Sequence, residues 1–147
     1  DTLARYGLGC WSISNHLAGQ CVCDTLPGAY DSRLDGFAPA ELAGKPEAIQ
    51  AWAIEEMKNT ARAAKAMGVD VVTFFMGSPI WKFWYSFPQT SEAQVEAGYQ
   101  QVKALWSPIM ETLSPRASSH VSFRLPTRFL RRDLAQGGRL WRHTQIA

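Results

Sequence analysis

The residues with the most chemical potential follow two short apolar segments. Asn15 and His16 come after the first, and Gly77, Ser78 and Trp81 come after the second. The His16 imidazole can move a proton, bind a metal or hold a sugar hydroxyl, or simply bond a loop carbonyl. A Gly-Ser turn can direct backbone amides toward an anion. The Trp81 indole can stack on a sugar face or close a sheet edge against water. We take these five residues as candidates for substrate binding.

Other reactive side chains are less suitably spaced. His16, Cys21 and Cys23 form an H-x4-C-x-C pattern, but it lacks a fourth ligand and the paired arms of structural zinc sites. The sequence contains no P-loop, GxGxxG, GxSxG or HExxH motif. The pattern therefore predicts neither catalytic residues nor metal ligands within this chain.

Strands and a long connection are expected to position the candidates. Segment 9–17 mixes β-branched and aromatic residues and predicts a strand that ends near His16. Segment 69–76 is almost continuously apolar, which is typical of a strand buried on both faces of a parallel sheet. Residues 18–45 lack a sustained helical period and contain several Pro and Gly residues. This pattern predicts a long loop with about one turn of helix.

Two helices complete the expected order. Pro46 suits a first helical position and Gly68 a C-terminal stop, so an amphipathic helix is predicted over 46–67. Ser91 and Gln94 have the spacing of a capping box and predict a second helix that ends near Leu113. Alternating strands and helices indicate an α/β fold of βα units, in which function lies at the carboxyl ends of parallel strands.

The charge pattern divides the chain at residue 114. Residues 1–114 carry 8 Lys or Arg and 12 Asp or Glu, whereas 115–147 carry seven Arg, one Asp and no Lys. This Arg-rich tail (115–147) is either a basic arm for nucleic acid or a non-native or disordered stretch of the kind that out-of-frame translation produces. The second interpretation is favoured, because the expected strand–helix alternation also stops there.

Composition indicates a cellular location. No apolar run reaches the roughly 18–20 residues that a membrane span needs, so no membrane partner is expected. Three cysteines are an odd number and favour a reducing compartment, which we take to be the cytoplasm.

Short blocks along the chain occur in a recognisable order. They are residues 13–17, 19–20, 22–24, 55–58, 61–64, 67–69, 77–81, 85–88 and 106–109. Together they resemble the sugar phosphate isomerase/epimerase family of xylose isomerase-like (β/α)8 TIM barrels, a group that also includes endonuclease IV. The resemblance covers roughly residues 3–113. It implies that residues 3–113 are the second and third βα units of such a barrel, within a partial TIM-barrel domain of residues 1–114.

The resemblance also implies an activity. The family isomerises or epimerises a sugar or sugar phosphate by shifting a proton or hydride next to a carbonyl, with a divalent metal bound by acidic and histidine side chains. Its first metal ligand lies in a Glu-x-His-Pro-like segment on the fourth strand, and no such segment follows Leu113. His16 and Trp81 match positions that line the family's pocket.

These implications define the expected state of the chain. It is expected to be an inactive N-terminal fragment whose metal ligands and catalytic groups belong to a missing C-terminal barrel half. The expected small-molecule partner is a sugar or sugar phosphate. The alternative is a nucleic-acid-binding protein, acting either like endonuclease IV or through the Arg-rich tail.

Overall fold

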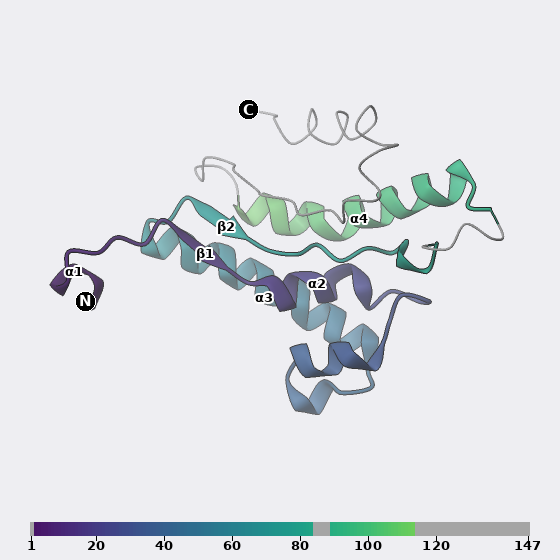
Figure 1. Cartoon of the computed structure of the whole chain (residues 1–147), viewed down its shortest axis with the longest axis horizontal. Helices are drawn as coiled ribbons and strands as arrows, with labels where there is room; N and C mark the ends of the chain where they lie inside the picture. The colour runs from purple at the N-terminus through teal and green to yellow at the C-terminus, as the bar shows by residue number, and fades with distance from the viewer. Residues whose placement is uncertain (1, 84–88, 114–147) are drawn as a thin grey trace.

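The computed structural model describes residues 2–83 and 89–113 as a mixed α/β fold that is mostly helical (Figure 1). The elements in chain order are α1 (Thr2–Arg5), β1 (Ser12–Ser14), α2 (His16–Asp24), the 3₁₀ helices η1 (Ser32–Phe37) and η2 (Ala40–Leu42), α3 (Pro46–Met67), β2 (Val71–Thr73), the 3₁₀ helix η3 (Trp81–Phe83) and α4 (Glu92–Leu113). The Arg-rich tail lies outside the described residues.

The two strands form a parallel sheet, as the alternating pattern predicts. Ile13 pairs with Val72, flanked by the pairs Ser12 with Val71 and Ser14 with Thr73. Each strand is shorter than the apolar segment that contains it. With only one described partner strand apiece, pairing is limited to the three residues that the two strands share.

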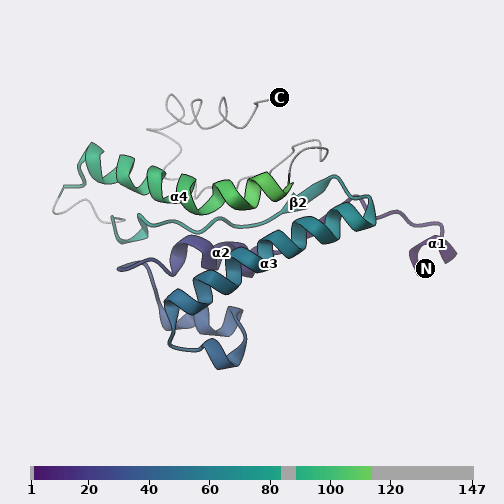
Figure 2. The ribbon, with the colours of Figure 1, turned by 180° about the vertical axis from the view of Figure 1, so that it is seen from behind.

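The core lies where α2, α3 and α4 pack against one another, and α3 also packs against β2. Its largest fully buried side chains are Cys21, Val22, Cys23, Ile49, Met57 and Ile109. The N-terminal arm, residues 2–11, extends from one end of this body, as the two opposite views in Figure 1 and Figure 2 show. Large apolar side chains of the arm are exposed, including Tyr6 and Trp11. No helix among the described residues is long and apolar enough to cross a membrane.

Helix α3 confirms the predicted boundaries. It begins with Pro46 and ends at Met67, and Gly68 follows in the left-handed conformation with φ 67°. The Gly68 N–H bonds the carbonyls of Ala64 and Lys65, which satisfies part of the helix C-terminus. Ile49, Ala53, Met57, Ala61 and Ala64 are all buried and form the core-facing stripe.

The prediction of a loop over 18–45 was wrong at its start, because α2 is a nine-residue helix. Its first turn has no capping side chain, since Asn15 makes no side-chain bond to the helix. Gly19 further weakens the local helical signal. The helix is stabilised by burial of Ala18, Cys21 and Val22, whose i, i+3, i+4 spacing places them on one face. Tertiary packing therefore outweighs weak local propensity here.

Helix α4 confirms the predicted capping box. The Gln94 backbone N–H donates to Ser91 Oγ at 3.3 Å, and the Ser91 N–H donates to Gln94 Oε1 at 2.8 Å. These reciprocal bonds satisfy backbone donors that the helix itself leaves free. The helix then continues through Pro108 to Leu113.

The capping box gives a measurable stability contribution. We expect Ser91→Ala to lower the free energy of unfolding by about 1 kcal/mol, because Ser91 Oγ accepts the Gln94 N–H. The matched control is Ser107→Ala within α4, where Ser107 Oγ donates to the Lys103 carbonyl at 2.7 Å. Alanine favours a helix interior, so this control should be neutral or slightly stabilising. Urea denaturation followed by circular dichroism measures both, and equal losses would contradict a capping role.

Candidate functional site

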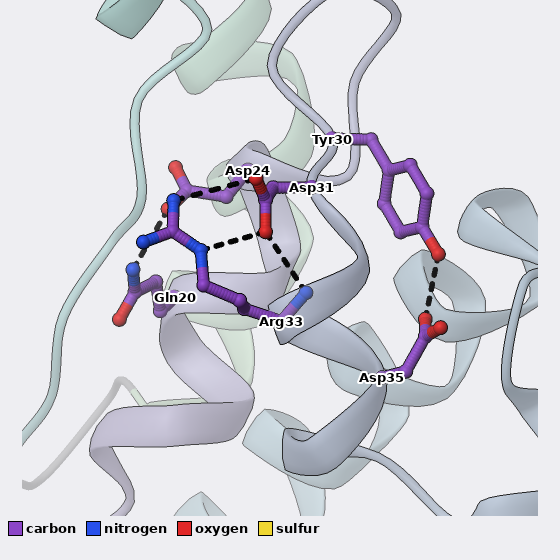
Figure 3. A network of polar contacts seen from close by, with 6 residues as sticks. All are labelled: Gln20, Asp24, Tyr30, Asp31, Arg33 and Asp35. Atoms are coloured by element: carbon purple, nitrogen blue, oxygen red, sulfur yellow. Dashed lines mark hydrogen bonds and ion pairs between the residues drawn. The ribbon is translucent and has the colours of Figure 1, made fainter.

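The Asp24 carboxylate, at the end of α2, is a buried group that accepts hydrogen bonds from three different residues. Its Oδ1 accepts hydrogen bonds from the Ser78 backbone N–H at 2.6 Å and from Trp81 Nε1 at 2.7 Å. Its Oδ2 accepts from Gln20 Nε2 at 2.9 Å, a contact visible in Figure 3. Asp24 is only 5% exposed. We call Gln20, Asp24, Gly77, Ser78 and Trp81 the Asp24 cluster.

Gly77 lets the loop after β2 approach α2 closely. Its φ is 68°, a left-handed conformation that side-chain-bearing residues rarely adopt. A Cβ at this position would lie against the Gln20 carbonyl oxygen and 2.8 Å from Asp24 Oδ1. The absence of a side chain therefore lets Ser78 and Trp81 reach the carboxylate.

The Ser78 amide does point at an anionic group, but that group belongs to the protein. The sequence suggests that a Gly-Ser turn can direct amides toward a bound anion. Here the Ser78 N–H is bonded to Asp24. The turn thus has the geometry of an anion-binding loop with its anion supplied from α2.

Asn15 and His16 lie apart from the Asp24 cluster, at the other end of α2. Eight residue steps separate His16 from Asp24, which corresponds to about 12 Å of helix. Asn15 Nδ2 donates to Thr60 Oγ1 of α3 at 2.8 Å. The His16 ring contacts Phe75 edge-on, with ring centroids 4.6 Å apart. The five sequence candidates therefore fall into two groups, which α2 separates.

Two members of the cluster were not among the sequence candidates. Gln20 and Asp24 are four residues apart, a spacing that places both side chains on one face only if the segment is helical. Because the sequence pattern predicts a loop there, this signal was missed. The available clue was the polar i, i+4 pair interleaved with buried Cys21 and Val22.

Burial raises the pKa of the Asp24 carboxyl above its ordinary value, while the bonds donated by Ser78, Gln20 and Trp81 oppose the rise. Burial disfavours the charged form, and hydrogen bonds to that form favour it. The net upward direction means that the folded state binds the Asp24 proton more tightly than the unfolded chain does.

The raised pKa of Asp24 predicts how the stability of the protein depends on pH. A raised folded-state pKa contributes stability that is fully present below about pH 4, where unfolded aspartate is protonated, and is lost as pH rises through the folded-state pKa. We therefore expect wild type to lose stability relative to Asp24→Asn as pH rises from acid to neutral. Urea denaturation of both proteins across that range measures the difference. A difference that stays flat with pH would contradict the raised pKa.

The control variant for this experiment, Asp31→Asn, should show the opposite dependence of stability on pH. Hydrogen bonds from the Arg33 side chain and backbone lower the pKa of exposed Asp31. Its contribution is present above the unfolded pKa and is lost as pH falls through the folded pKa. Wild type should accordingly lose stability relative to Asp31→Asn toward acid, so the two variants distinguish the Asp24 effect from general acid destabilisation.

The buried cysteines are poor nucleophiles in this setting. Burial, and then the nearby Asp24 charge, raises the pKa of Cys21 to about 11. Burial likewise raises the pKa of Cys23 to about 12, against the lowering effect of a hydrogen bond with Trp106. Both remain thiols at neutral pH, whereas nucleophilic attack and metal binding require thiolates. Among the described residues, no group of three or more His, Cys, Asp or Glu side chains could hold a metal ion.

Thiol accessibility can be tested directly. Cys10 is half-buried, whereas Cys21 and Cys23 are completely buried. We expect one thiol per chain to react with an aromatic disulfide reagent in the native state and all three in urea. Cys10→Ser should abolish the native reaction. More than one fast-reacting thiol in the native wild type would contradict this assignment.

A second group of polar contacts lies near the start of η1. Asp31 accepts hydrogen bonds from the Arg33 backbone N–H at 2.9 Å and from Arg33 Nε at 2.7 Å, and Tyr30 donates to Asp35 at 2.6 Å (Figure 3). Asp31 and Arg33 are exposed and close in sequence, so their ion pair contributes little to stability. These contacts organise the turn into η1.

Comparison of the chain with known protein families and with curated protein sequences finds no match. The site must therefore be interpreted from its own geometry. That geometry combines a buried carboxylate, a close-packed glycine turn and an oriented indole at the carboxyl-terminal side of β2.

Proposed function

We propose that residues 1–114 are part of a (β/α)8 barrel of the sugar phosphate isomerase/epimerase family and contribute a wall of its sugar site. The observation that carries this proposal is the placement of the candidates. Asn15 and His16 follow β1, while Gly77, Ser78 and Trp81 follow its parallel partner β2. Both groups thus come after carboxyl ends of parallel strands, where barrel enzymes place their sites.

The two faces of the sheet support the same proposal. Val72 is buried and Ile13 packs against the core, so these paired residues face the helices. Ser12 and Ser14 alternate with Ile13 and are exposed. In a closed barrel, the face opposite the helices lines the interior. Further strands paired at the edges of this sheet would enclose the face that carries Ser12 and Ser14.

The described residues do not fit the divalent metal that such an enzyme is expected to use. Both Asp24 oxygens already accept hydrogen bonds from protein donors, and burial holds Cys21 and Cys23 as thiols. We place the metal ligands and the proton-transferring groups of the full-length enzyme outside this chain. The chain alone is then catalytically inactive, and the missing barrel half is its partner.

Two other parts of the proposal rest on composition. Three free cysteines suit a reducing compartment such as the cytoplasm. Nucleic-acid binding through the Arg-rich tail is the second candidate function, and its support is the seven arginines of residues 115–147. The excess of acidic residues over 1–114 disfavours it, because that part would repel phosphates.

Sugar binding by the full chain tests the proposal. The indole N–H resonances of ¹⁵N-tryptophan-labelled protein would be followed during titration with D-fructose and D-xylose, a ketose and an aldose. We expect a saturable shift of the Trp81 resonance, which Trp81→Phe identifies because that resonance is absent from its spectrum. The matched control is Trp11→Phe, because Trp11 is exposed and lies in the N-terminal arm. A Trp81 resonance unmoved by either sugar would contradict the proposed function.

A further inference from the structure

The Asp24 carboxylate uses donors that a bound phosphate would need. Phosphate sites in turns rely on free backbone N–H groups and nearby side-chain donors. In this turn, the Ser78 N–H and Trp81 Nε1 both donate to Asp24 Oδ1, at 2.6 and 2.7 Å. Gln20 Nε2, the third polar donor, is bonded to Oδ2. An incoming phosphate would have to break these bonds.

The negative charge of Asp24 also disfavours a bound phosphate. Asp24 is buried, so an anion placed beside it meets negative charge that water screens poorly. The two ion pairs formed among the described side chains join Arg33 to Asp31 and Lys58 to Glu55, so neither involves Asp24. Like charges held close together in a buried site strongly disfavour each other's ionised forms.

We propose that Asp24 excludes phosphate from the turn at residues 77–81, so that the ligand presented to Trp81 is an unphosphorylated sugar group. This inference rests on the proposed function for the identity of the ligand. The exclusion itself depends only on the contacts of Asp24. A neutral hydroxyl group can approach Trp81 without displacing the carboxylate. In this proposal, the sugar contacts the face of the Trp81 indole.

The test uses inorganic phosphate as the probe, with the full ¹⁵N-labelled chain at pH 7.5 and constant ionic strength. The Ser78 amide and Trp81 indole resonances report the turn. In wild type, neither should show a saturable shift. In Asp24→Ala, which frees the donors and removes the charge, both should shift saturably, with an apparent Kd at least tenfold below any wild-type value. Phosphate should also raise the Tm of Asp24→Ala and leave that of wild type unchanged.

Two further variants control for misfolding of Asp24→Ala and for its change in net charge. Asp24→Asn keeps the side-chain shape if the alanine variant fails to fold. It should show a smaller gain, because its amide oxygen can still accept the Ser78 and Trp81 bonds, although its Nδ2 cannot accept the Gln20 bond. Asp70→Asn changes the net charge equally at an exposed position before β2, and it should gain no phosphate site. Should neither Asp24 variant fold, the wild-type titration alone decides.

Saturable binding of phosphate to the wild-type turn would overturn the proposal, as would a folded Asp24→Ala protein that gains none. The outcomes for phosphate exclusion can be distinguished from those for the proposed sugar-binding function. A chain that binds no sugar, yet gains a phosphate site in Asp24→Ala, retains the exclusion and loses the sugar-binding role. A chain that binds sugar at Trp81 and also binds phosphate there retains the sugar-binding role and loses the exclusion.

Discussion

Gly77→Ala is expected to lower the free energy of unfolding by about 3 kcal/mol or more, because it combines backbone strain with a steric conflict. The φ of 68° is unfavourable for alanine, and the new methyl group would lie against the Gln20 carbonyl and the Asp24 carboxylate. The Gln20 carbonyl belongs to the backbone and cannot rotate away, so α2 and the 77–81 turn must separate. Urea denaturation followed by circular dichroism measures the loss.

Gly44 provides the matched control for this prediction. Its φ of 73° is nearly the same, but a Cβ there would meet nothing within 4 Å. Gly44→Ala should therefore cost only the backbone strain, about 1 kcal/mol. The difference between the two variants isolates the close approach of the turn to α2. Similar losses for both would show that the turn and α2 are not in contact.

The Trp81 indole gives a second measurement on the same variants. If the turn separates from α2, Trp81 Nε1 loses its bond to Asp24, and its N–H resonance should move toward the position of a solvent-exposed indole. Gly44→Ala should leave that resonance unchanged. An unchanged Trp81 resonance in Gly77→Ala would mean that the loop relaxes without releasing the carboxylate.

Helices with strong local signals were the predictable part of this fold. Pro46 and Gly68 mark the ends of α3, and Ser91 with Gln94 marks the start of α4. Each signal acts within a few residues, so it can be recognised without knowledge of the tertiary structure. The α2 helix has no such signal, because Asn15 bonds Thr60 instead of capping the helix.

The Asp24 cluster was only half predictable for a related reason. Gly77, Ser78 and Trp81 share one turn and stand out in the sequence as a group. Their common partner is more than 50 residues away along the chain, in a helix that the local pattern does not reveal. Contacts of this kind follow from the parallel pairing of β1 with β2, which brings the segments after both strands to the same side of the sheet.

Trp106→Ala is expected to produce the other large loss, about 3–5 kcal/mol, which is typical for truncation of a buried tryptophan. The Trp106 ring stacks on Phe74 with centroids 4.6 Å apart and an interplanar angle of 11°. Its Nε1 donates to the Met76 carbonyl at 3.3 Å. Because it is only 2% exposed, its removal leaves a cavity between α4 and the segment after β2. Urea denaturation measures the loss. Far-UV circular dichroism is followed instead of tryptophan fluorescence, because the variant lacks Trp106.

Two substitutions divide this effect into its parts. Trp106→Phe keeps an aromatic ring against Phe74 but removes the donor to Met76, so it should lose less than the alanine variant. Trp11→Ala removes an indole that is 84% exposed and should change stability by less than about 0.5 kcal/mol. A Trp106→Ala loss as small as that of Trp11→Ala would mean that α4 does not pack on the segment after β2 in solution. Because Phe74 and the turn at 77–81 both belong to the segment after β2, such a result would also remove the support that holds Trp81 in place.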